Sequence, residues 1–125
     1  MVYYFVVKLL MASRTLLMNQ NVLLLAAQSG DIKKVHTLLD TGASVNVCDN
    51  YTGTSALMYA ANYGYVEVVR ALIKAGADVN LRRRQYGLTA LMLAAAANQV
   101  DVVKLLISAN SDVNATNEDG STALM

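Results

Sequence analysis

A period of 34 residues runs through the chain and constrains its fold more than any other feature. Three unrelated sequence markers return at this interval. They are the pairs Ala26-Ala27, Ala60-Ala61 and Ala94-Ala95, the pairs Val45-Asn46, Val79-Asn80 and Val113-Asn114, and the runs beginning at Ser55, Thr89 and, one residue early, Thr122. Independent markers seldom share a period by chance. Each unit is therefore predicted to be one supersecondary element that buries its apolar face only against its neighbours.

Each unit is predicted to contain two short helices. The first helices are expected at residues 22–29, 56–63 and 90–97, and each follows a side chain whose oxygen can accept the free amides of a helix start, namely Asn21, Ser55 and Thr89. The second helices are expected at residues 32–39, 66–74 and 100–108, where apolar residues recur at helical spacing.

Glycines mark the ends of these helices. Gly30 and Gly64 separate the two helices of a unit, and Gly42 and Gly76 end the second helix. Such positions favour a left-handed backbone, which glycine adopts without steric cost. In the third unit Asn98 and Asn110 take these places, and asparagine tolerates that conformation better than most residues.

The pattern Gly53-x-Ser-Ala-Leu-Met-x-Ala-Ala-x-x-Gly-x-x-Glu-Val-Val-Arg, followed by Ala75-Gly-Ala-Asp-Val-Asn80, resembles the ankyrin repeat. The resemblance covers residues 19–125. It implies an all-α ankyrin repeat solenoid of helix-turn-helix units with β-hairpin fingers, in repeats of about 19–52, 53–86 and 87–119 and a partial fourth at 120–125. Residues 1–18 are expected to form an apolar N-terminal helix or a degenerate half-repeat.

Two departures from the family pattern stand out. In the family's Thr-Pro-Leu-His motif, this chain has alanine in place of the proline and methionine, Met58 or Met92, in place of the histidine. We therefore expect apolar packing and a softer interface between repeats. The loops 46–53, 80–87 and 114–120, called here the first, second and third fingers, also differ in length. The first two carry one extra residue, which predicts a bulge or a larger tip.

The resemblance implies a protein or peptide partner bound by the finger tips and the inner helices. One candidate set is the second tip, Arg82, Arg83, Arg84, Gln85 and Tyr86. It is either a hot spot for an acidic or phosphorylated partner or a solvated turn. The other set joins the first tip, Asn50, Tyr51 and Thr52, to Tyr59, Asn62 and Tyr63 on the inner helix, with Leu88 and Leu93 one repeat later. A contact role is favoured for Tyr63 and left open for Tyr59.

Other function classes find little support. The net charge of +1 favours neither nucleic acid nor an anionic membrane, and no apolar run approaches the ~20 residues of a membrane span. The single cysteine, Cys48, excludes an internal disulfide and suits a reducing compartment, so a cytoplasmic location is expected. His36 and Cys48 lie on different elements without an activating motif, so neither an enzyme, a cofactor nor a metal site is predicted.

Two hypotheses for the function follow. The first is a module that binds a protein or peptide, acidic at one spot, through the concave face and the finger tips. The alternative is a segment of a longer array that stacks end to end with other copies into a homo-oligomer. With three full units and no polar cap, we expect marginal stability of the isolated monomer.

Overall fold

The computed structural model describes residues 2–4, 6–7 and 22–123. Its labelled helices are α2 (Ile32–Asp40), α3 (Ala56–Tyr63), α4 (Val66–Lys74), α5 (Ala90–Ala96) and α6 (Val100–Ser108). Residues 22–29 are also helical, as are residues 2–4 and 6–7. The predicted all-α repeat fold is confirmed, and each predicted helix from residue 22 onward ends within one residue of the observed one.

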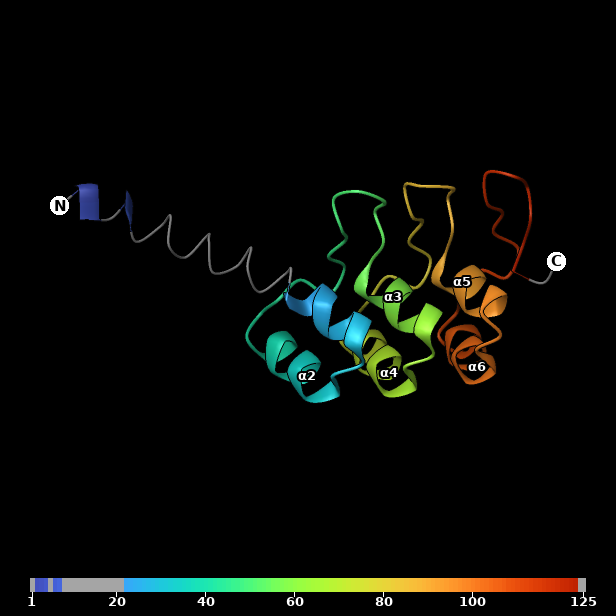
Figure 1. Ribbon diagram of the computed structural model, residues 1–125, viewed down its shortest axis with the longest axis horizontal. Coiled ribbons are helices and arrows are strands. Elements are labelled where there is room, and N and C mark those ends of the chain that lie inside the picture. Colours follow the sequence, from blue (N-terminus) through green and yellow to red (C-terminus); the bar gives the residue numbers. More distant parts are fainter. Residues whose placement is uncertain (1, 5, 8–21, 124–125) are drawn as a thin grey trace.

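The helices form two layers (Figure 1). Residues 22–29, α3 and α5 make the layer beside the projecting fingers, and α2, α4 and α6 make the layer below it. Within a repeat, α3 packs against α4 and α5 against α6; between repeats, α3 packs against α5 and α4 against both α2 and α6. Among the labelled helices, these contacts all lie within a unit or between neighbouring units, as the sequence period requires.

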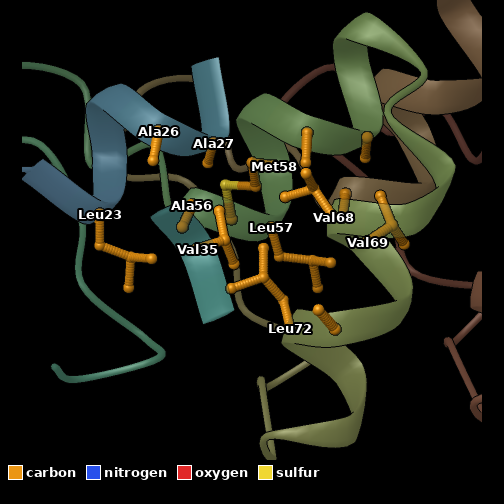
Figure 2. Packing of buried hydrophobic residues seen from close by; sticks show 14 of the residues in the cluster. Leu23, Ala26, Ala27, Val35, Ala56, Leu57, Met58, Val68, Val69 and Leu72 are labelled. Carbon is orange, nitrogen blue, oxygen red and sulfur yellow. The ribbon is translucent and has the colours of Figure 1, made fainter. Parts of the chain in front are cut away.

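The core lies between the layers and continues from one repeat to the next. In Figure 2, Leu23, Val35, Leu57 and Leu72 converge from four successive helices. All four are almost completely buried. The alanine pairs of the first two repeats and Ala94 of the third are also buried, whereas Ala95 is half-buried; a small side chain at these positions lets neighbouring helices approach closely. The repeated Ala-Ala marker is therefore a packing requirement.

Side-chain caps start several of these helices. The Ser55 hydroxyl accepts a hydrogen bond from the Met58 amide at 3.2 Å, and Thr89 caps the amide of Met92 in the same way. Asp31, which was not predicted as a cap, accepts from the Lys34 amide at the start of α2. The predicted cap Asn21 lies outside the described residues.

The turn inside each repeat explains one glycine in detail. Gly64 has a φ of 77°, and an added Cβ would lie 2.3 Å from Oε1 of Gln99 in the next repeat. The Gln99 Nε2 group meanwhile donates to the carbonyl oxygen of Asn62 at 3.2 Å. Gly64 is therefore required both by its backbone conformation and by the close approach of the following repeat. Asn98 and Asn110 have the predicted positive φ, at 59° and 68°.

The three fingers are loops more than hairpins. In the described part of the chain, the only β-type pairing is an isolated bridge between Cys48 and Ser55, so the ladder implied by the resemblance is not formed. An amide-to-carbonyl bond crosses each finger near its tip instead: Asp49 to Thr54, Arg83 to Leu88, and Asn117 to Ser121. In the first finger the Ala56 amide also donates to the carbonyl of Val47. The extra residue of the first two fingers falls between the bonded residues, which confirms the larger tip.

Candidate functional site

Hydrogen bonds tie the fingers into a row that stands on one side of the helices (Figure 1). At the bases, Oδ1 of Asn46 accepts from the Asp78 amide at 2.8 Å, and Oδ1 of Asn80 accepts from the Asp112 amide at 2.7 Å. Near the tips, the Gln85 amide donates to the carbonyl of Thr52. Each of these three bonds joins one repeat to the next. The repeated Val-Asn marker thus sets the spacing of the fingers.

The Asp78 carboxylate accepts a hydrogen bond from the Asn80 amide at 3.0 Å, and the Asp112 carboxylate accepts one from the Asn114 amide at 2.9 Å, an arrangement typical of aspartate in turns. Each aspartate therefore stabilises its own finger base while its amide joins it to the finger before. This arrangement holds the row of tips in a defined register over the inner helices.

Asp49 organises the first tip. Its carboxylate accepts hydrogen bonds from the Thr52 amide at 2.7 Å, from the Thr54 amide at 3.2 Å and from the Tyr59 hydroxyl at 2.7 Å. The Tyr51 amide and the Thr52 hydroxyl donate to it as well. The tip is therefore anchored to α3 through a single carboxylate.

This network shifts two pKa values in opposite directions. Burial opposes ionisation of Asp49, but the bonds from the Thr52 amide and the Tyr59 hydroxyl outweigh it and hold the pKa of the carboxyl well below its ordinary value. Burial, together with the bond to Asp49 and its charge, raises the pKa of Tyr59. Tyr59 is therefore a protonated donor with a structural task, which the sequence left undecided.

The three arginines of the second finger point to different places. Arg82 donates through Nη2 to the carbonyl of Thr116 in the third finger. Arg84 donates through Nη2 to the carbonyl of Asn50 in the first finger at 2.8 Å. These two side chains brace the neighbouring fingers, so the triplet does not form one continuous basic patch.

Arg83 differs from its neighbours. Its Nε donates to the carbonyl of Gln85 in the same finger at 3.1 Å, and no hydrogen bond of its Nη groups occurs within the described residues. The one ion pair formed there joins Arg70 to Glu67, so the charge of Arg83 is not neutralised by an acidic partner in that part of the chain. Among the described residues its Nη groups therefore remain available to bind an anion.

The structure brings several predicted residues together around one hollow of about 260 Å³. It lies between the first two fingers and the inner helices α3 and α5. Of the predicted residues, it is lined by Thr52, Tyr59, Asn62, Tyr63, Arg83 and Leu93. Thr54 and Met58 complete the wall. Tyr63 is 51% exposed, and its ring centroid lies 5.8 Å from that of Tyr65.

A second hollow, of about 220 Å³, lies one repeat further along. Leu88, Ala96 and Asn117 line it at the positions that Thr54, Asn62 and Arg83 hold in the first. Met92 takes the place of Met58. The second hollow is therefore the more apolar of the two, and it has no cationic side chain in its lining.

Of the remaining predicted residues, all except Leu88 lie outside both hollows. Asn50 and Tyr51 are exposed at the first tip, where Tyr51 is 96% exposed. Gln85 and Tyr86 are exposed at the second tip with Arg82 and Arg84. Leu88 is the one predicted residue that lines the second hollow. The predicted residues thus fall into two groups: those that line the groove formed by the two hollows, and those that form an outer rim at the finger tips.

Sequence reasoning missed residues that shape this surface. Asp49 was overlooked although Asp-x-x-Thr is a turn signal. Met58 was expected only to pack, yet its sulfur also accepts the Ser55 amide at 3.4 Å. Tyr86 has a φ of 68°, a left-handed conformation that a residue of this type seldom adopts, and no sequence signal indicated it.

Cys48 and His36 are not arranged as a nucleophilic pair. His36 is exposed on α2, and Cys48 is half-buried in the first finger with its sulfur near the carbonyl of Asn46. Burial raises the pKa of the Cys48 thiol, and the charge of Asp49 adds to this while Arg84 partly counters it. A raised pKa disfavours the reactive thiolate.

Comparison with known families agrees with the fold. The family described as Ankyrin repeats (3 copies) matches residues 2–83, and the family described as Ankyrin repeat matches residues 86–118. The chain therefore belongs to the ankyrin repeat family, whose members are generally protein-interaction modules. No curated protein matches the chain. Within residues 2–4, 6–7 and 22–123, no helix is long and apolar enough to cross a membrane, and no three potential metal ligands cluster.

Proposed function

We propose that this protein binds an extended segment of another protein along the two hollows, with the finger tips as an outer rim. The observation that carries this proposal is the gathering of Tyr63, Leu93 and Arg83 around one open hollow. An exposed tyrosine, an aliphatic side chain and an arginine are the kinds of residue on which binding energy concentrates.

The row of fingers supports the same proposal. Because backbone bonds and Asn side chains connect neighbouring fingers, the surface is organised before a partner arrives. Preorganisation lowers the entropy cost of binding. The single free thiol, Cys48, suits a protein that works in a reducing compartment such as the cytoplasm.

Selection from a displayed library of random 12-residue peptides tests this function. We expect selected peptides to lose at least about tenfold in affinity for Leu93→Glu, because the new carboxylate lies in the first hollow. Ile107→Glu is the matched control, since Ile107 lies on α6 outside both hollows and is 45% exposed. Equal binding to both variants, at equal urea midpoints, would count against the groove.

Self-association through the end of the stack is a second candidate function. Val69 of α4 is fully buried, whereas its equivalent one repeat later, Val103 of α6, is only partly buried, and Ile107 beside it is 45% exposed. This apolar face supports stacking of another repeat. Light scattering over a hundredfold range of concentration tests it: a rising mass supports self-association, and a constant mass near 13.4 kDa speaks against it.

A further inference from the structure

The two hollows offer different chemistry at equivalent positions. In the first, Arg83 presents a guanidinium, and Thr52 and Asn62 add polar groups. In the second, the position of Arg83 is held by Asn117, and that of Asn62 by Ala96. A ligand that fills both would therefore carry a hydrogen-bond acceptor with negative charge at one site and an apolar side chain at the other.

The distance between the hollows limits the shape of such a ligand. They are related by one repeat, and neighbouring packed helices lie about 8–10 Å apart. A polyproline II peptide rises about 3.1 Å per residue with three residues per turn. Side chains three residues apart then lie on the same face, about 9 Å from each other, whereas in a β-strand they would point to opposite faces.

The charge in the first hollow favours a carboxylate over a phosphate. Arg82 and Arg84 are directed to carbonyls of the third and first fingers, so Arg83 is the cation that lines the hollow. One guanidinium balances one negative charge and pairs well with a carboxylate. A phosphate carries nearly two charges at neutral pH and would be only half neutralised there.

We infer that the partner segment is an extended peptide with an Asp or Glu side chain in the first hollow and an apolar side chain, three residues away, in the second. This inference rests on the proposed function and specifies the chemistry of its partner. The carboxylate binds the Nη groups of Arg83, and the apolar side chain packs on Leu88 and Met92.

Fluorescence anisotropy with short peptides tests the inference. The probes are labelled proline-rich peptides with Glu and Leu three residues apart, in both orders, together with copies in which Gln or phosphoserine replaces Glu. The order that binds more tightly is expected to lose about tenfold on replacement of Glu by Gln. The affinity of the same Glu peptide for the Arg83→Gln protein is expected to fall by a similar factor, and the Arg83→Lys protein should recover part of that affinity.

Two further comparisons make the result specific. Arg70→Gln, on α4 outside the hollows, is the matched control and should leave affinity unchanged. In a double-mutant cycle, Arg83→Gln should have little further effect on the Gln peptide, because the contact is already lost. A urea midpoint equal to that of the parent protein shows that Arg83→Gln remains folded.

The contradicting outcomes are distinct from failure of the proposed function. Equal affinity for Glu and Gln peptides, with binding still abolished by Leu93→Glu, would overturn the inference and leave the groove as the binding site. Tighter binding of phosphoserine than of Glu would overturn the choice of carboxylate. Absence of binding by every probe would overturn the inference, whereas library peptides indifferent to Leu93→Glu would overturn the proposed function itself.

Discussion

Replacement of Asp49 by alanine tests how the first finger is held. The change removes the carboxylate that joins the Thr52 and Thr54 amides and the Tyr59 hydroxyl. Alanine offers no acceptor, so these donors must find water or remain without a partner. The tip that presents Thr52 to the first hollow is then no longer anchored to α3.

The size of the effect follows from which donors water can reach. Thr54 is buried, and Tyr59 and Thr52 are half-buried, so their three bonds are poorly replaced by water. With about 1 kcal/mol net for each such bond, Asp49→Ala should lower the free energy of unfolding by about 3 kcal/mol. The exposed Tyr51 amide can turn to solvent and adds little. Asp49→Asn retains an acceptor oxygen and should cost about 1 kcal/mol.

Urea unfolding followed by circular dichroism measures both changes. The midpoint should fall in the order parent, Asp49→Asn, Asp49→Ala, with an unchanged dependence of the free energy on urea. Asp101→Asn on α6 is the matched control, because Asp101 is exposed and its carboxylate accepts no hydrogen bond from another of the described residues. A loss below about 0.5 kcal/mol for Asp49→Ala would refute this account of the finger.

The same carboxylate predicts a pH dependence. Its pKa in the folded protein is lowered, and its unfolded value is about 3.9. The stabilisation is therefore complete above that unfolded value and is lost as the pH falls through the folded pKa. The difference between the parent and Asp49→Asn should be constant from pH 5 to pH 7 and shrink below about pH 4. A difference that grew in acid would contradict the lowered pKa.

Two backbone positions give further predictions, each measured by urea unfolding. Tyr86→Asn should stabilise the protein by about 0.5 kcal/mol, because asparagine tolerates the left-handed φ of 68°. The control Tyr51→Asn, at the exposed first tip, should be neutral. Destabilisation by Tyr86→Asn would show that contacts of the Tyr86 ring stabilise the fold by more than its backbone strain costs. Gly64→Ala should cost about 2–3 kcal/mol, since its Cβ displaces Gln99, whereas Gly76→Ala, with open space around it, should cost about 1 kcal/mol. Equal losses would mean that Gln99 moves aside freely.

The helices and their breaks could be predicted from the sequence because the fold repeats the same local solution. Ser55 and Thr89 cap equivalent helices, and Gly64 and Asn98 both adopt positive φ. In a stack where each unit meets only its neighbours, a local pattern seen three times nearly determines the packing. Residues 8–18, which complete the expected N-terminal helix, lie outside the described residues, so that expectation stays a prediction.

The surface formed by the fingers and hollows was less predictable from the sequence, because it depends on the directions of individual side chains, which the repeat period does not determine. Three consecutive arginines looked like one patch, but Arg82 and Arg84 bond to carbonyls of opposite neighbouring fingers and only Arg83 lines the hollow. Tyr86 in the second finger adopts a strained left-handed φ of 68°, which Thr52 at the equivalent position of the equally long first finger does not share. Tip length was readable from the sequence, whereas the path of the chain through the tip was not.

The most direct test of the central claim is a two-dimensional amide NMR titration of the labelled protein with a peptide selected for binding. If the partner lies along the two hollows, the largest shift changes will fall on Arg83 and Leu93 in the first and on Leu88 and Met92 in the second, with little change along α4. The account would be contradicted if the largest chemical-shift changes fell on the second-layer helices α2, α4 and α6 while those four residues were unaffected.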